Sequence, residues 1–205
     1  MVGIVTSIYQ QMYDAIEACD EPCEVLVIGS NDGAGSARWR IPDSVSSVRR
    51  FDALAEPDGH VERAVVHNHA GILTFFQVDT SKEPPADWIK GISSLRPGSN
   101  AQNLRSGSGK DRDFISAHRV LRPVPLTPVR TLGTPGVPKF FILDIEGMDY
   151  DVSLSLFRSG DVVGVGCEHA LMSSDEVILL RCAAIESRFR FVFGEEDAIF
   201  LREEG

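Results

Sequence analysis

Three stretches of the chain, residues 25–28, 139–145 and 162–167, consist mainly of consecutive apolar side chains. Unbroken apolar runs of this length are typical of strands that are buried on both faces of a parallel sheet. The chain ends with a different pattern, in which residues 189–193 and 198–201 flank a glycine-containing turn. This pattern predicts an antiparallel hairpin at the C-terminus.

Apolar residues at helical spacing occur before and between these strands. The N-terminal segment, residues 1–23, holds a predicted helix with Thr6 or Ser7 at its N-cap. Further helices are predicted over residues 149–157 and 174–185. Buried strands that alternate with helices and end in a hairpin predict an α/β three-layer sandwich with a mostly parallel sheet.

The length of the chain, 205 residues, suits one such domain and is too short for two. We therefore expect residues 24–205 to form a single domain. Residues 79–113 are rich in Pro, Gly and Ser and lack periodicity, which predicts a long lid-like loop. Its Arg and Lys side chains either close over an anionic acceptor or simply solvate a surface segment. Residues 120–132, rich in Pro and Val, predict an irregular edge strand.

Composition narrows the classes of function. Hydrophobic residues make up 43% of the chain and charged residues 24%, as in ordinary globular proteins. The formal net charge of −10 argues against a general nucleic-acid binder, since phosphate backbones need a basic surface. The four cysteines are too few for a disulfide scaffold, and no apolar run has the length of a membrane span. We expect a reduced, cytoplasmic protein with neither a nucleic-acid nor a membrane partner.

Polar residues and glycines follow each of the three buried strands. Because the carboxyl ends of parallel strands share one edge of the sheet, these residues are expected to line a common crevice. They are the turn 29–33 after the first strand, Asp144 and Glu146 after the second, and Glu168 and His169 after the third. The glycines of the turn permit a close approach of the backbone to a nucleotide-like cofactor, and Glu56, after the next strand, is placed for ribose hydroxyls.

Four sequence motifs together resemble the FkbM-type S-adenosylmethionine-dependent methyltransferases. They are VLVIGSNDGAGS (25–36) followed by Glu56-Pro57, FILDIEGMDYDVSLSL (141–156), VGVGCEH (163–169) and EEDAIFLRE (195–203). The resemblance covers about residues 24–203. It implies a class I methyltransferase (Rossmann-like) fold, with a seven-stranded sheet whose last two strands form the hairpin. It also implies methyl transfer to a hydroxyl group of a small molecule, a sugar or a natural product.

The resemblance also assigns roles to residues. The methionine and ribose parts of the cofactor would lie against Gly29, Ser30, Asn31, Asp32 and Gly33. Glu56 would bind the ribose diol. Asp144 and Glu146 would lie beside the methyl group and the acceptor hydroxyl, with Glu168 and His169 on the far wall.

Methyl transfer is an in-line displacement that depends mainly on positioning, and an alcohol acceptor also benefits from a base. We favour Glu146 or His169 as that base, with Asp144 orienting the cofactor or acceptor. The acids could instead cap the following helix, and His169 could be a hydrogen-bonded wall residue. A divalent metal on these oxygens is another reading, but no spacing demands it, so no metal is expected.

Two other functions stay open. The segment after Glu56 is short, which favours a non-catalytic binding or scaffold protein with the same fold. An NAD-dependent oxidoreductase is less favoured, because Arg38 stands where the G-x-G-x-x-G fingerprint needs its last glycine. Exposed edge strands are compatible with a homodimer.

Overall fold

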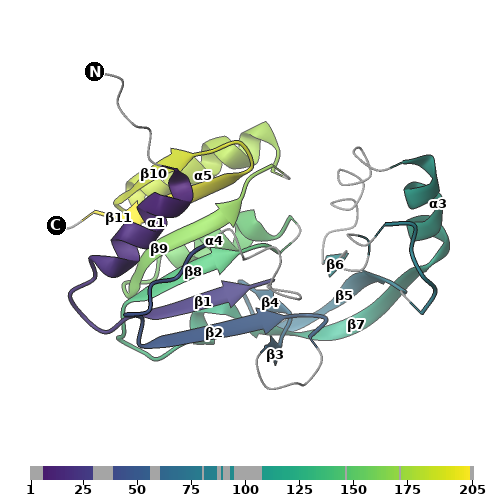
Figure 1. Cartoon of the computed structure of the whole chain (residues 1–205), viewed down its shortest axis with the longest axis horizontal. Helices are drawn as coiled ribbons and strands as arrows, with labels where there is room; N and C mark the ends of the chain where they lie inside the picture. Colours follow the sequence, from purple (N-terminus) through teal and green to yellow (C-terminus); the bar gives the residue numbers. More distant parts are fainter. Residues whose placement is uncertain are drawn as a thin grey trace.

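The structure is a computed structural model that describes residues 7–29, 39–55, 61–79, 81–86, 89, 93–94, 108–145, 147–170 and 172–203. Within these residues a seven-stranded sheet has the order β10-β11-β9-β8-β1-β2-β3 (Figure 1). Its strands are β1 (Glu24–Ile28), β2 (Ser47–Asp52), β3 (Glu62–Arg63), β8 (Lys139–Leu143), β9 (Val162–Glu168), β10 (Phe189–Phe193) and β11 (Asp197–Arg202).

Neighbouring strands of this sheet run parallel, except that β11 is antiparallel to both β9 and β10. The structure therefore confirms an α/β fold with a mostly parallel, Rossmann-like sheet that ends in an antiparallel hairpin. The predicted buried strands coincide with β1, β8 and β9, and every residue of β1 and β8 is buried.

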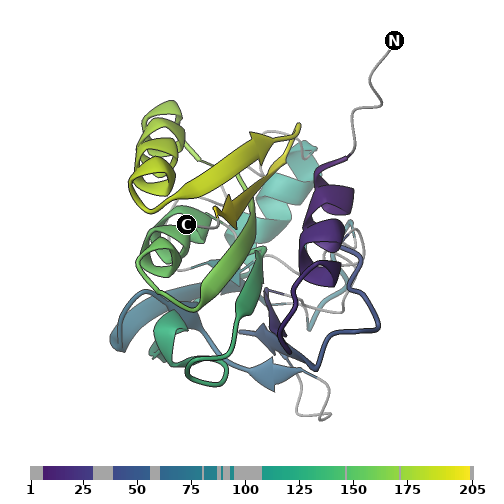
Figure 2. The ribbon, with the colours of Figure 1, turned by 90° about the vertical axis from the view of Figure 1, so that its left-hand side faces the viewer.

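Helices cover both faces of the sheet, which gives the predicted three layers (Figure 2). Helix α1 (Ile8–Glu17) lies on one face and buries Ile8, Met12 and Ile16 against it. Helices α4 (Asp149–Phe157) and α5 (Ser174–Glu186) cover the other face. The Oγ of Ser7 accepts a hydrogen bond from the backbone of Gln10, so Ser7 is the N-cap of α1.

A second sheet forms an arm that the sequence analysis did not predict. Its order is β4-β7-β5-β6, formed by β4 (Val66–His67), β7 (Arg119–Pro128), β5 (Gly71–Val78) and β6 (Ser93–Ser94). Strands β5 and β7 make a long antiparallel ribbon, which extends beyond the carboxyl ends of β1 and β8 (Figure 1). At the far end, Phe76, Val78, Ile89 and Ile115 form a small core of their own.

The expected irregular edge strand is in fact β7, which lies between β4 and β5 and is followed by the 3-10 turn η3 (Val129–Thr131). Its prolines at 123 and 125 do not break the ribbon. Residues two apart direct their backbone nitrogens to the same side of a strand, so one side keeps its hydrogen bonds. Strand β4 pairs only with Thr127 and Pro128, beyond both prolines.

Most of the expected lid-like loop, residues 79–113, lies outside the described residues. Its last part differs from the expectation, because residues 109–113 belong to helix α3 (Gly109–Ala117). A reciprocal capping box between Ser108 and Asp111 starts this helix. No helix in the described part of the chain is long and apolar enough to cross a membrane.

Candidate functional site

The candidate site lies where β1 and β8 end side by side. These parallel strands are in register to their last residues, where Ile28 pairs with Leu143. The backbone N–H of Asp144 then donates to the Ile28 carbonyl at 2.9 Å, and the N–H of Gly29 donates to the Phe51 carbonyl at 2.8 Å. The ends of β2, β1 and β8 are therefore fixed relative to one another by backbone hydrogen bonds.

Gly29 approaches the backbone of Asp144 more closely than any other residue type could. It has a φ of +83°, and a Cβ added to it would lie 1.8 Å from the Asp144 carbonyl oxygen. A side chain at position 29 would therefore have to push the two turns apart. The structure thus brings Gly29, the first residue of the predicted glycine turn, against Asp144, the first acid of the second motif.

The third predicted element lies at the end of β9, the other neighbour of β8: Glu168 is the last residue of this strand, and His169 follows it. His169 is tied to the turn between β10 and β11. Its N–H donates to the Glu196 carbonyl at 2.7 Å, and its Nε2 lies 3.1 Å from the Gly194 carbonyl oxygen. The ring also contacts Phe193 edge-on. These contacts match the hydrogen-bonded wall residue that was one of the two expectations for His169.

Asp149 is the acid that the sequence analysis missed. It is the first residue of α4 and is only 1% exposed, although it carries a carboxyl group. Neither carboxyl oxygen has a hydrogen-bond partner of good geometry among the described residues. Burial, followed by the negative charges of Asp144 and Glu168, raises its pKa well above the ordinary value. Nearby backbone amides counteract this shift only in part, so the fold favours the protonated carboxyl.

The surroundings of Asp149 are also buried. Ser153, one helical turn later, is fully buried, and its Oγ has no hydrogen-bond partner among the described residues. The Cys167 thiol on β9 is fully buried as well, and its pKa is raised by burial and by the Asp149 charge. Buried carboxyl, hydroxyl and thiol groups of Asp149, Ser153 and Cys167 therefore lie near one another, where α4 packs against β9.

A signal for Asp149 was present in the sequence. Asp149, Val152 and Leu156 follow the i, i+3, i+7 spacing of one helix face, and that face is buried. An acid at the start of a helix is usually read as a favourable partner of the helix dipole. This interpretation takes no account of burial, and the structure shows that Asp149 lies on the buried side of α4.

Several predicted site residues cannot be placed. Ser30, Asn31, Asp32, Gly33, Glu56 and Glu146 lie outside the described residues. The described part of the site therefore consists of Gly29, Asp144, Asp149, Glu168 and His169. Among the residues that the structure describes, no group of three or more His, Cys, Asp or Glu side chains is arranged to hold a metal ion.

The opposite edge of the sheet has a hollow of another kind. It lies at the amino ends of β8 and β9, and its charged lining residues are already engaged in the fold. Lys139 Nζ lies 2.6 Å from Asp161 Oδ2, and the Arg130 guanidinium donates to the carbonyl and hydroxyl oxygens of Ser155. These charges hold the strand starts and η3 in place, so the carboxyl edge remains the candidate site.

Comparisons of this chain with protein-family models, with curated proteins and with solved structures give no match.

Proposed function

We propose that this protein is an S-adenosylmethionine-dependent methyltransferase that acts on a hydroxyl group of a small molecule. The observation that carries the proposal is the contact between Gly29 and the Asp144 backbone at the carboxyl edge of a mostly parallel sheet. This edge is where open α/β sheets bind nucleotide-like ligands. The antiparallel hairpin formed by the last two strands also agrees with the fold that the FkbM-type resemblance implies.

The charge of the described residues fits this cofactor. The bare backbone at Gly29 lets the ends of β1 and β8 lie in contact, and residues 30–33 and Glu56 are proposed to form the methionine and ribose subsites. S-adenosylmethionine carries a positive sulfonium and an ammonium group. The negative charges of Asp144 and Glu168 act together at this edge, since both raise the pKa of Asp149. A local negative field of this kind attracts a cationic ligand.

When bound, the cofactor supplies an electrophilic methyl group, and the chain must position the acceptor and remove its proton. Glu146 remains a proposed base. His169 is a second one: with Nε2 donating to the Gly194 carbonyl, Nδ1 is left as the proton acceptor. Asp144 is proposed to orient the cofactor or acceptor, since its backbone is fixed against Ile28.

Asp149 adds a positioning role to this scheme. Three carboxylates crowded at one edge repel one another, and the one with the least solvent takes up a proton first. A protonated Asp149 lets Asp144 and Glu168 keep their charges for ligand binding. We therefore propose that Asp149 supports the site from behind without contacting the ligand.

Isothermal titration calorimetry separates this proposal from its two rivals. We expect S-adenosylmethionine to bind at one site per chain, with a Kd of about 1–100 μM. Heat from NAD⁺ without heat from S-adenosylmethionine would favour the oxidoreductase instead. No binding of either cofactor to the folded chain would favour the scaffold protein.

A further inference from the structure

Helix α5 is apolar on two opposite faces. Leu180 and Ala184 are fully buried against the sheet and α4. On the outer face Ile178, Leu179 and Ile185 are 57%, 54% and 65% exposed. Surface helices normally carry polar residues on the outer face, and a helix that is apolar all round is normally covered all round.

The exposed residues form one continuous stripe. Ile178, Cys182 and Ile185 follow the i, i+4, i+7 spacing of a single helix face, and Leu179 widens it. Cys182 is an exposed free thiol in the middle of this α5 stripe. Helix α5 packs beside β10, an edge strand on which Val192 is also 37% exposed.

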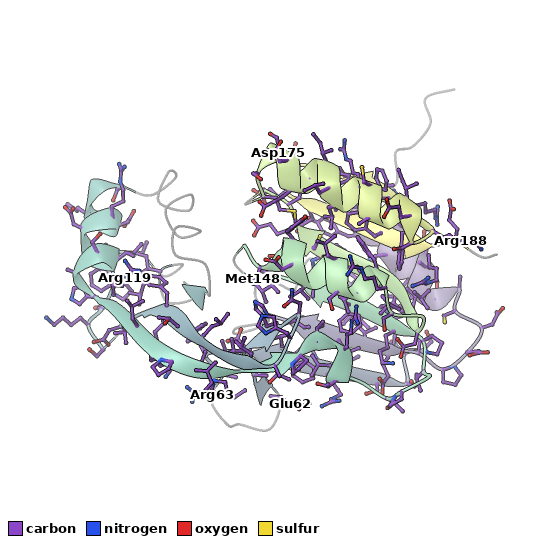
Figure 3. The ribbon with its side chains drawn as sticks, turned by 180° about the vertical axis from the view of Figure 1, so that it is seen from behind. Glu62, Arg63, Arg119, Met148, Asp175 and Arg188 are labelled. Atoms are coloured by element: carbon purple, nitrogen blue, oxygen red, sulfur yellow. The ribbon has the colours of Figure 1, made fainter. Side chains whose placement is uncertain are left out.

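The net charges at the two ends of α5 are opposite in sign, because Arg188 and Arg190 outnumber Glu186, the exposed last residue of the helix. Asp175 lies in the first turn, and Arg188 follows the last turn, at the other end of the helix (Figure 3). Arg190, on β10, adds a second exposed positive charge near that end. An antiparallel pair of identical helices would place each acidic end beside a basic end.

We propose that α5 is the interface of a homodimer, in which the α5 helices of two copies pack antiparallel around a two-fold axis near Cys182. In this arrangement Cys182 of one copy faces Cys182 of the other. Leu179 and Ile185 lie three residues before and three residues after Cys182, so Leu179 meets Ile185 of the partner subunit. Asp175, in the first turn, lies beside the C-terminal end of the partner's helix, where Arg188 of the partner subunit follows α5 and Arg190 of the partner subunit lies on β10. The same patch serves both copies, as a two-fold interface requires.

A second copy fits this surface better than a membrane or an unrelated partner. The chain has a net charge of −10, which repels anionic lipid surfaces. A second copy supplies the matching surface, an apolar centre flanked by the same two charged ends in the reverse order. The stripe faces away from the sheet, so two-fold pairing leaves both candidate sites open. The inference does not depend on the proposed methyl transfer.

Sedimentation velocity on the full chain, at concentrations from about 1 to 200 μM, tests the inference. This range covers the micromolar Kd expected of an interface formed by one helix of each copy. We expect a dimer whose Kd rises at least tenfold in Ile185→Glu. The matched control is Ile72→Glu, because Ile72 is an equally apolar residue on the arm and is 72% exposed. It should leave the dimer intact. A monomer throughout the range, or equal loss of the dimer in both variants, would overturn the proposal.

A second measurement locates the axis. Mild oxidation with added copper phenanthroline removes two protons and two electrons from a pair of thiols and should join Cys182 of the two copies by a disulfide. A covalent dimer on a non-reducing gel is expected for the wild type and not for Cys182→Ser. Asp175→Arg should weaken the dimer, and adding Arg190→Glu should restore it. The interface would lie elsewhere if a dimer forms but Cys182 gives no crosslink and neither charge change alters the Kd of the dimer.

Discussion

The carbonyl oxygen of Asp144 occupies the space that a side chain on residue 29 would need. The distance from that oxygen to an added Cβ is only 1.8 Å, well inside van der Waals contact. The two turns belong to strands that are more than a hundred residues apart in sequence, yet they form one packed junction at the carboxyl edge.

Gly29→Ala should therefore strongly destabilise the fold. We expect a loss of about 3 kcal/mol or more in the free energy of unfolding, from the clash and the positive φ combined. Gly136→Ala is the matched control, since Gly136 has a φ of +77° but nothing within 4 Å of an added Cβ. It should cost only about 1–2 kcal/mol. Urea denaturation measures both values, and similar losses would contradict the close contact.

Asp149→Asn should change how stability depends on pH. A carboxyl whose pKa is raised by folding contributes stability in acid, and this contribution is lost as the pH rises through the folded-state pKa. Asparagine stays neutral at every pH. The Tm of the variant minus the Tm of the wild type should therefore be larger at pH 8 than at pH 4. The same Tm difference at both pH values would show that folding does not raise the pKa of Asp149.

Asp161 is expected to have the opposite pH dependence. Burial raises its pKa, but hydrogen bonds from Lys139 and Ser159 outweigh burial and lower it overall. Its contribution is therefore present above the unfolded-state pKa near 3.9 and is lost as the pH falls below that value. Stability measured from pH 6 to pH 2.5 should decline less steeply in Asp161→Asn than in the wild type. An equally steep decline in stability over this pH range in both proteins would show that Asp161 does not stabilise the fold in its charged form.

The same pair also predicts a coupling energy. Asp161→Asn leaves the Lys139 ammonium, whose side chain is 4% exposed, without its hydrogen-bonded carboxylate and with only the weaker electrostatic interaction with Glu24. We expect this variant to lose about 2–3 kcal/mol at pH 7, less than for a fully buried pair because Asp161 is partly exposed. The double variant Asp161→Asn with Lys139→Met should recover part of that loss. Additive effects in a double-mutant cycle would show that the two charges are not coupled.

Asp144→Asn tests the electrostatic part of the proposed site. Removing this charge should weaken S-adenosylmethionine binding about tenfold and leave the fold intact, because the backbone hydrogen bonds of Asp144 remain. Asp20→Asn is the control, since Asp20 is an exposed acid that precedes the amino end of β1, whereas the candidate site lies at the carboxyl end. It removes the same formal charge and should bind like the wild type. Equal weakening in both variants would indicate a general effect of net charge.

The central sheet could be predicted from the sequence because its strands are buried on both faces. Helices α1 and α4 also followed from the pattern, since Met12 and Val152 lie at helical spacing within apolar stripes. The arm was predicted only in part. A strand was expected within residues 120–132, where β7 lies, but its place in a separate sheet was not expected, because exposed apolar residues such as Ile72 and Leu121 obscure which face of the ribbon is buried.

The site was predictable only where sequence pattern reflects topology. Gly29 and Asp144 follow neighbouring parallel strands, and the edge that they share follows from that arrangement alone. The behaviour of Asp149 depends on burial behind α4 and on two acids from other strands. The orientation of His169 depends on the hairpin turn at Gly194. Such contacts arise from tertiary packing, which no local pattern encodes.

A crystal structure of the chain grown with S-adenosylhomocysteine would show whether the cofactor binds at the carboxyl edge. We expect the nucleoside and amino-acid parts of this ligand to lie against Gly29 and Asp144, at the carboxyl ends of β1 and β8. Ligand density at any other place on the chain, or an empty carboxyl edge at saturating ligand, would contradict this expectation.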